Sequence, residues 1–309
     1  MRYEPNEDQA ALIAALERLT ASEDARWAVA PGEARCDWSA RLDALIEENG
    51  FFDAAAEETL GPVAAAETVR RLAALPVLVE ASASALLRPA LAPDLPRPLA
   101  VLPAGPGAVA PFLPLARAVL RIGEAGVEAA TLAEGDVETV ESLHAYPMGR
   151  LAREDLAWTR LEADPAAAAD LWRTALAAEL AGVLQGGLDA VVAHVTQRRQ
   201  FGRPLGSFQG IQHRLAGAAV KIEGARWLAL RAAEARTPAD PPEALGYAQR
   251  ISTEVCYDLH QFMGAMGLTL EHPLHRWTGR ARWLRSALGG ADAALRLAAS
   301  RRWGEGAAA

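Results

Sequence analysis

The sequence predicts a mainly α-helical protein with a small β insert, and three observations lead to this fold class. Three leucines within residues 7–22 recur at helical spacing, behind acidic residues that favour a helix N-terminus. Prolines then crowd the stretch from residue 87 to residue 114, and the helical period disappears there. The helical pattern returns after Asp164-Pro165 and persists over long segments. We therefore expect helices, then strands, then helices.

The predicted elements divide the chain into an N-terminal helical domain of residues 1–95, a small β domain of residues 96–164, and a C-terminal four-helix bundle of residues 165–309. Short pieces between Gly and Asp turns, such as AVLRIG and GVEAATL, predict the strands. A helix of about 30 residues spans about 45 Å, which suits a long up-down bundle. The helices are expected at residues 7–22, 39–49, 61–87, 166–198, 207–236, 241–265 and 274–301.

Composition and charge exclude several functional classes. The net charge of −8 argues against a nucleic-acid surface. Charged residues or prolines interrupt the apolar stretches before about 18 residues, so we expect no membrane span. The first ten residues lack a signal segment, and two cysteines, Cys36 and Cys256, do not form a disulfide framework by their spacing. We expect a globular protein of the cytoplasm.

The most informative stretch is RRQFGRPLGSFQGIQHRLA, which runs from residue 198 to residue 216. It joins a basic, aromatic turn to a long amphipathic helix. The Arg198 guanidinium can donate two parallel hydrogen bonds to phosphate oxygens, and Gly202 lets the backbone come close to a ligand. These residue types suit a diphosphate and a flat adenine ring. The stretch therefore points to a flavin site.

A second run, QFMGAMGLTLEHPLHRWTGRAR, spans residues 261–282. The first run resembles the pattern R-x-x-F-G-x-P-[IL]-x-x-[FH]-Q-x-[IL] of the acyl-CoA dehydrogenase family, and the second resembles Q-x-x-G-[GA]-x-G-[FY]-x-x-E-x-P-[LV]-x-[RK] of the same family. The resemblance extends over roughly residues 160–300. It implies the same three-part order and the FAD-dependent oxidation of an acyl-CoA to its 2-enoyl-CoA.

Two features that the resemblance leads us to expect are missing. Family members hold the flavin ring with hydroxyl-bearing loops of the middle domain, yet no serine or threonine occurs between Ala85 and Ala130. The β domain is therefore interpreted as truncated. The family's catalytic glutamate falls on Leu288 or, in a minority of members, on Trp172, and neither side chain accepts a proton. The nearby acids Glu179 and Asp292 are interpreted as solvated or N-terminal helix charges, so no catalytic residue is assigned.

The retained motifs are of the kind that one subunit lends to the FAD of its neighbour. By the resemblance, Arg198 binds the pyrophosphate and residues from the second run close on it, while aromatic and apolar side chains line the adenine. The implied FAD contacts are Arg198, Gln200, Phe201, Leu205, Phe208, Gln209, Ile211, Gln261, Gly264 and Ala265. His272 and His275 lack a third clustered ligand and are interpreted as structural, so no metal site is expected.

This combination resembles the degenerate, base-less subunit of bacterial heterotetrameric acyl-CoA dehydrogenases, in which a full-length catalytic chain pairs with a shorter one as α2β2. The resemblance implies that the partner binds most of the acyl-CoA and that an electron-transfer flavoprotein accepts the electrons. By analogy alone, the substrate is the CoA thioester of a steroid side chain, for which a degenerate half-site offers room.

Two other functions remain open from the sequence. The chain could be a flavin-free structural or regulatory helical protein that descends from this family. It could also be a self-sufficient homo-oligomeric dehydrogenase whose base has moved to another position. A yellow, active homo-oligomer would favour the second of these.

Overall fold

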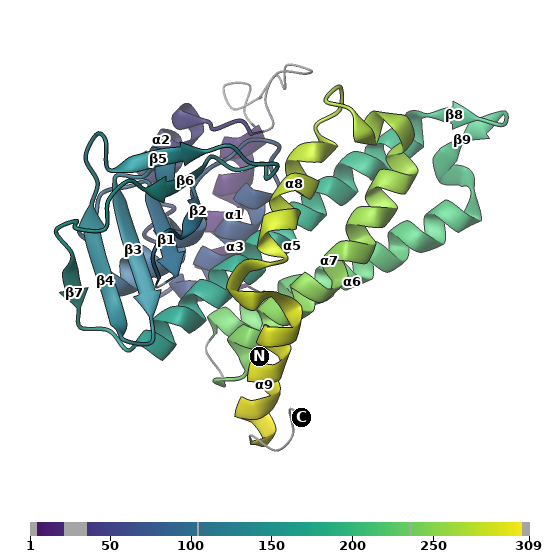
Figure 1. The fold of residues 1–309 in the computed structure, drawn as a ribbon. Coiled ribbons are helices and arrows are strands. Elements are labelled where there is room, and N and C mark those ends of the chain that lie inside the picture. Colours follow the sequence, from purple (N-terminus) through teal and green to yellow (C-terminus); the bar gives the residue numbers. More distant parts are fainter. Residues whose placement is uncertain (1–4, 22–35, 104, 235–236, 305–309) are drawn as a thin grey trace.

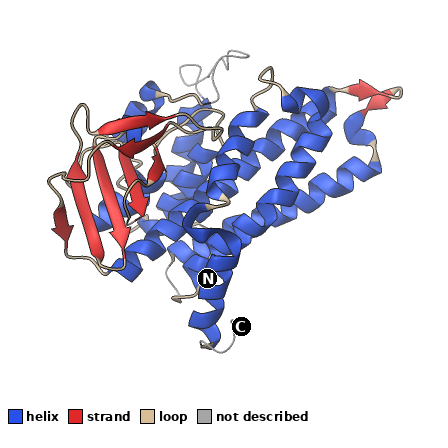
Figure 2. Ribbon diagram, in the orientation of Figure 1, coloured by secondary structure: helices blue, strands red, loops and turns tan. Residues whose placement is uncertain are grey.

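The computed structural model describes residues 5–21, 36–103, 105–234 and 237–304. Figure 1 shows the strands gathered on one side, the N-terminal helices beside them, and a long bundle that extends away from both. Figure 2 shows that helices dominate and that the strands form one compact group, apart from a small hairpin at the far end of the bundle. The expected fold class, mainly α with a small β insert, is confirmed.

The N-terminal helices are short, and the second of them begins at a side-chain cap. Ser39 begins the second helix because its hydroxyl accepts a hydrogen bond of 3.2 Å from the Leu42 N–H. The helix expected over residues 61–87 is only partly correct: the observed helix ends at Ala73, and a π-helical turn begins at Ala83 after a segment of turns and bends. The elements are α1 (Glu7–Ala21), α2 (Ala40–Glu48), α3 (Gly61–Ala73), η2 (Ala83–Leu87) and α4 (Arg88–Leu91).

The strands form two small sheets. One sheet has the order β1-β3-β4-β7, in which β1 pairs in parallel with β3 and the other pairs are antiparallel; the second has the antiparallel order β2-β6-β5. A separate apolar cluster that includes Leu102, Leu113 and Val119 lies among them. The strands are β1 (Leu99–Pro103), β2 (Val109–Pro111), β3 (Ala118–Gly123), β4 (Gly126–Thr131), β5 (Val137–Val140), β6 (Met148–Leu151) and β7 (Thr159–Leu161).

The C-terminal bundle is built around one 33-residue helix, α5 (Pro165–Gln197). The Asp164 carboxylate caps the start of this helix, where it accepts a hydrogen bond of 2.9 Å from the Ala167 N–H. Pro165 suits the first helical position because proline has no N–H that would need a partner there. The remaining elements are η4 (Leu205–Ser207), α6 (Gln209–Ala233), α7 (Asp240–Met263), η5 (Gly264–Leu268), α8 (Leu274–Leu284), η6 (Ala287–Gly289) and α9 (Gly290–Trp303).

The helix expected over residues 274–301 is wrong, because the structure breaks it in two. Leu288, Gly289 and Gly290 have φ angles of 53°, 88° and 76°, which no right-handed helix accommodates. Two consecutive glycines favour such a turn. The bundle therefore has a fifth helix, α9, which packs against α7.

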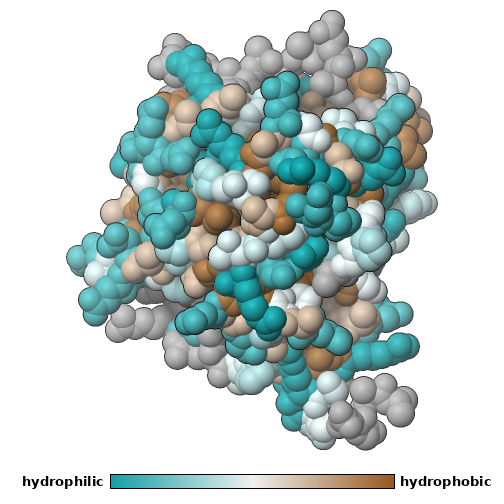
Figure 3. All heavy atoms as spheres, turned by 60° about the vertical axis from the view of Figure 1, so that its left-hand side comes forward, coloured by the Kyte–Doolittle hydropathy of each residue, from teal (hydrophilic) through white to brown (hydrophobic). Residues whose placement is uncertain are grey.

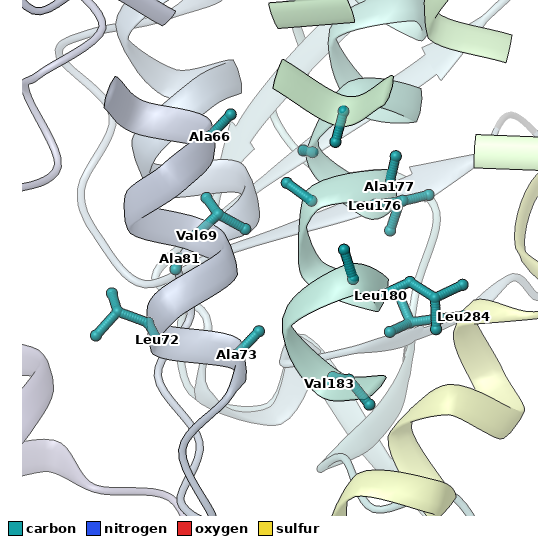
Figure 4. Close-up of a cluster of buried hydrophobic side chains, with 14 of the residues drawn as sticks. Ala66, Val69, Leu72, Ala73, Ala81, Leu176, Ala177, Leu180, Val183 and Leu284 are labelled. Carbon is teal, nitrogen blue, oxygen red and sulfur yellow. The ribbon is translucent and has the colours of Figure 1, made fainter. Parts of the chain in front are cut away.

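The central helix α5 also corrects the expectation that no segment is apolar enough to span a membrane. By length and composition α5 passes that test, but 72% of the tested window is buried within the protein. Figure 4 shows a part of this core: α5 runs beside α3, and its side chains Leu176, Ala177, Leu180 and Val183 lie on the side that faces Leu284. The apolar run therefore belongs to the core of the bundle.

Three buried side chains of α8 tie the bundle to the end of α3. Arg276, Trp277 and Arg280 donate to the main-chain oxygens of Pro76, Ala74 and Leu75 at 3.4, 3.0 and 2.7 Å. The last carbonyl groups of a helix and those just after it have no hydrogen-bond partner within the helix. At the C-terminal end of α3, the arginine and tryptophan side chains of α8 supply these partners. These contacts fix the N-terminal helices against the bundle.

We expect Gly186→Ala to lower the free energy of unfolding by about 1–3 kcal/mol, which is the usual cost of overpacking a core. A methyl group at Gly186 would overlap the Ala74 carbonyl oxygen and the Trp277 indole nitrogen. Gly217 in α6 is the matched control, because a methyl group there meets nothing within 4 Å, and Gly217→Ala should stabilise by roughly 0.5–1 kcal/mol. Urea unfolding of both variants measures the difference; equal stabilities would contradict the close approach.

Candidate functional site

The first sequence motif forms a short hairpin, the arm, at the far end of the bundle (Figure 1). Strand β8 (Arg199–Gln200) pairs antiparallel with β9 (Arg203–Pro204), so that Gln200 lies opposite Arg203. The arm follows α5 and leads into α6. Its basic residues Arg198, Arg199 and Arg203 are all exposed. An exposed basic hairpin is available to a ligand or to another chain.

Phe201 and Gly202 form the tip of the arm. Both adopt positive φ angles, 52° and 81°, and the Phe201 side chain is 87% exposed. Its ring meets the Phe208 ring edge-on at 6.1 Å between centroids, and the Arg203 guanidinium lies 4.0 Å above the Phe208 ring. The two rings and the guanidinium thus form one aromatic and cationic surface.

Arg198 lies where α5 ends. Its backbone is extended and no longer helical. Its N–H donates a hydrogen bond of 2.8 Å to the His194 main-chain oxygen, and its carbonyl oxygen accepts one of 2.8 Å from the Leu205 N–H. The side chain is exposed beside the arm. The main-chain bonds hold the Arg198 backbone at both ends, which positions the guanidinium at the base of the hairpin.

The other predicted residues of the first motif divide into two groups. Gln200 and Gln209 are exposed, whereas Leu205 and Ile211 are partly buried and pack against the main core. Leu205 and Ile211 therefore anchor the arm to the bundle, whatever else they contact. The hydrogen bonds and ring contacts of the arm are local and lie between His194 and Gln212.

The second motif lies at the end of α7, at the same end of the bundle as the arm (Figure 1). Gln261 is exposed on the last turn of α7, and Gly264 ends that helix with a φ of 66°. Ala265 follows in η5 and is also exposed. The ten predicted site residues thus lie at one end of the molecule, in the arm and in this second, neighbouring segment.

The positions where the family places its base carry apolar side chains in distinct settings. Trp172 is 6% exposed within the core, and Leu288 is partly buried in the left-handed turn between α8 and α9. Asp292 is 76% exposed in the first turn of α9, as a helix N-terminal charge. Among the described residues there is no group of three or more His, Cys, Asp or Glu that could hold a metal ion.

The interpretation of Glu179 as a solvated charge is wrong. Glu179 is partly buried at a narrow crevice, where its carboxyl accepts hydrogen bonds from the Ser82 hydroxyl and, at 2.6 Å, from the Tyr146 hydroxyl. Trp172, Leu176 and Trp283 line the same crevice, which encloses only about 30 Å³. Burial raises the pKa of the Glu179 carboxyl, although both hydroxyls and Arg280 oppose this.

Sequence reasoning missed Glu179 because its partners are distant in the chain. Ser82 and Tyr146 lie 97 and 33 residues away, and no local pattern connects them. One signal was available: Glu179 interrupts the run TALAAELAGVL, whose other residues are small or apolar. A single acid inside such a run of a core helix is a candidate for a hydrogen-bonded, partly buried carboxyl.

The fold and this end-of-bundle arrangement define a known class of protein. Residues 166–303 match the model of the acyl-CoA dehydrogenase C-terminal domain. The C-terminal part of the chain is therefore an acyl-CoA dehydrogenase C-terminal domain, and the whole chain shares the fold of the solved structures described below. Its homologues in this family are FAD-binding oxidoreductases.

The acyl-CoA dehydrogenase FadE34 of Mycobacterium tuberculosis is 34% identical to the chain over 173 residues, which are 52% of this chain and 24% of FadE34. The chain thus matches about a quarter of that relative's length. Two solved structures share the fold. A variant of the Tcur3481-Tcur3483 steroid ACAD has a TM-score of 0.75 and 23% identity, covering 99% of this chain and 100% of that one. The ChsE4-ChsE5 complex from Mycobacterium tuberculosis has a TM-score of 0.73 and 20% identity, covering 96% and 97%.

We expect Trp172→Ala to widen the crevice and to make the chain bind an apolar fluorescent dye. The indole is buried, so its removal leaves a void and costs about 3–5 kcal/mol of stability. Trp303→Ala is the matched control, because Trp303 is 69% exposed on α9 and lines no part of the crevice. Dye fluorescence and thermal unfolding are measured on both. If Trp172→Ala binds no more dye than Trp303→Ala, Trp172 does not close the crevice.

Proposed function

We propose that the chain is the base-less subunit of a heteromeric, FAD-dependent acyl-CoA dehydrogenase, and that its arm completes the FAD site of a full-length partner chain. When bound, FAD supplies the acceptor for the hydride that leaves the acyl-CoA. The residues of this chain supply binding and orientation only. The observation that carries the proposal is the exposed cationic and aromatic surface of Arg198, Phe201, Arg203 and Phe208.

The donor set of the arm suits the diphosphate and adenine parts of FAD. Guanidinium groups match phosphate oxygens in geometry and charge, and exposed aromatic rings offer a face or edge to a flat base. Gln200, Gln209 and Gln261 add exposed amides at the same end of the bundle. In this proposal Leu205 and Ile211 line the adenine side, and the backbone at Gly264 and Ala265 closes on the diphosphate.

The chain lacks the corresponding set for a flavin ring of its own. The stretch from Ala85 to Ala130, which includes β1, β2 and β3, contains no serine or threonine hydroxyl. The crevice between the strands and the bundle is narrow, with a volume of about 30 Å³. An acyl-CoA chain does not fit in this crevice. We propose that the partner chain binds the acyl-CoA.

The distribution of exposed apolar side chains supports a protein partner on the bundle. Ten large apolar residues in the described part of the chain are more than a third exposed, and three of them, Val109, Leu143 and Trp303, lie among the strands or on α9. The other seven lie on α5, α6 and α7, on the arm and in the segment after α7: Val192, Phe201, Val220, Tyr257, Met266, Leu268 and Leu270. By contrast, Figure 3 shows that the face bearing the strands is mixed, with hydrophobic residues only in small, separate patches. Exposed apolar side chains that concentrate on one part of a molecule are typical of an interface.

Two solved structures that share the fold are the basis for the proposed subunit composition and substrate. The Tcur3481-Tcur3483 protein is a steroid ACAD and the ChsE4-ChsE5 structure is a complex of two components. We extend both features to this chain as an α2β2 heterotetramer that acts on CoA thioesters of steroid side chains. We also propose an electron-transfer flavoprotein as the electron acceptor and the cytoplasm as the location.

One observation favours a second candidate, a self-sufficient enzyme with a relocated base. Glu179 is a partly buried carboxyl in an apolar crevice, and burial raises its pKa, as is common for general acids and bases. It lies seven residues beyond Trp172 on α5, about 10 Å further along the axis. The narrow crevice argues against it, because a base must approach the proton that it removes.

We expect Arg198→Ala to weaken FAD retention about tenfold or more in the complex purified through a tag on this chain, since a charge-assisted hydrogen bond contributes about 1.5–3 kcal/mol. Arg250→Ala is the matched control, because Arg250 is 69% exposed on α7 and pairs with Asp292 rather than with the arm. The flavin content per complex is measured by absorbance.

Each alternative has its own outcome in this experiment. Unchanged flavin in Arg198→Ala would support the flavin-free structural protein or another source of phosphate contacts. A yellow, active homo-oligomer of this chain alone would support the self-sufficient enzyme. The proposed function requires a chain that is colourless alone and yellow with its partner.

A further inference from the structure

The outward side of α8 is cationic. This helix and its C-cap carry four arginines and no acidic residue. Arg276 and Arg280 are buried and donate to main-chain oxygens around the end of α3. Arg282 and Arg285 are exposed, and within the described part of the chain neither of them forms an ion pair with a carboxylate. Two guanidinium groups are therefore presented to the outside without a counter-charge.

Helix α7 adds polar groups beside the exposed pair. In Figure 1, α8 lies between the group of strands and α7. The His260 ring of α7 lies 3.1 Å from the Thr278 hydroxyl, and Arg285 donates a hydrogen bond of 3.1 Å to the Thr253 hydroxyl. Arg282 lies between these two cross-helix contacts in the sequence of α8. The contacts hold the two helices side by side and place hydroxyl and imidazole groups next to the guanidinium groups.

The loop between β5 and β6 closes the other side of the exposed pair. A methyl group at Gly279 would come within 2.9 Å of the Ala145 side chain, so this loop touches α8 one turn before Arg282. Burial lowers the pKa values of the His144 and His260 rings, and the nearby charge of Arg282 lowers both further. Both rings are therefore neutral at pH 7, and they act as hydrogen-bonding groups beside the arginines.

The acids in the second half of α7 are engaged elsewhere. Glu254 pairs with Lys221 and Asp258 pairs with Arg214, and both of these cations belong to α6. The two side chains of α7 that contact α8 through hydrogen bonds carry no negative charge. The whole chain has a net charge of −8, so an outward face with two arginines and no carboxylate runs against its general character.

We propose that this cationic face, formed by Arg282 and Arg285 with the imidazoles and hydroxyls beside them, binds carboxylate side chains of the full-length partner chain. The inference rests on the proposed function, which requires such a partner. Guanidinium groups pair with carboxylates through two parallel hydrogen bonds, and arginines are enriched at protein interfaces. The face also continues the proposed FAD-binding end of the bundle, because His260 directly precedes Gln261 on the last turns of α7.

The spacing of the polar groups favours a protein segment over one small anion. The contacts at Thr278 and Arg285 are seven residues apart on α8, which is about 10 Å along the helix axis. Several carboxylates along a partner segment can reach groups spread in this way, whereas one phosphate cannot. Cations near the C-terminal end of α8 also interact favourably with the helix dipole, which makes the face tolerable in the free monomer.

Charge reversal in the complex purified through a tag on this chain tests the proposal. Arg282→Glu combined with Arg285→Glu should lower the amount of partner recovered about tenfold or more, because like charges across an interface repel. Arg296→Glu is the matched control, since Arg296 is exposed on α9, and it should recover the wild-type amount. Thermal unfolding checks that the variants fold. Should the double reversal unfold the chain, Arg282→Gln with Arg285→Gln should still lower recovery, by about threefold.

Flavin and partner are measured in the same samples, which separates this proposal from the proposed function. Arg198→Ala should lose flavin and keep its partner, whereas the double reversal should lose partner while each remaining complex keeps its flavin. Equal partner recovery in the double reversal and in Arg296→Glu overturns the cationic face alone. Inorganic phosphate that binds to the isolated wild-type chain but not to the double variant, with unchanged partner recovery, would assign the face to a small anion instead. A wild-type chain that recovers no partner contradicts both proposals.

Discussion

The close approach of α3 to α5 is the contact on which the rest of the structure depends. Gly182 and Gly186 lie against the main-chain oxygens of Arg70 and Ala74, so that backbone meets backbone where α3 ends. Trp277 then donates to the same Ala74 oxygen from α8. Because this junction leaves no space for a methyl group, the N-terminal helices and the bundle form one body. Glu179, at the crevice, lies less than one turn before Gly182 on α5, beside the same junction.

Local patterns predicted most helices, and their failures have physical causes. The apolar periodicity and the Asp164-Pro165 start locate α5 to within a residue at each end. The same reasoning missed the break at Leu288, although the pair Gly289-Gly290 is a turn signal, because the helical pattern continues on both sides of the turn. It also misjudged Glu179, whose environment depends on side chains that the fold brings from 97 and 33 residues away. Local propensity describes an element well, but it carries no information about what packs on it.

The two ends of the molecule have opposite chemistry. Near the strands, a narrow crevice is lined by Trp172, Trp283 and Phe112, and its carboxyl is occupied by two hydroxyls. At the far end of the bundle, arginines and an aromatic ring are held out into solvent by a two-stranded arm. A chain that catalysed the reaction alone would need an open substrate site near the strands, where this chain has only the narrow crevice. The observed arrangement is coherent for a chain whose useful surface faces another protein.

Phe201, at the tip of the arm, is the residue that most strongly indicates a contact outside the monomer. A bulky non-glycine residue with a positive φ is strained by roughly 1–3 kcal/mol, and an exposed phenylalanine forgoes about 1.5–3 kcal/mol that burial would contribute. Phe201 has both features, with a φ of 52° and 87% of its side chain exposed. Within the monomer, its edge contact with Phe208 offsets a part of these costs. Contacts outside the monomer can recover the rest, because a partner or ligand that covers the ring buries its apolar surface while the turn keeps the geometry that presents it.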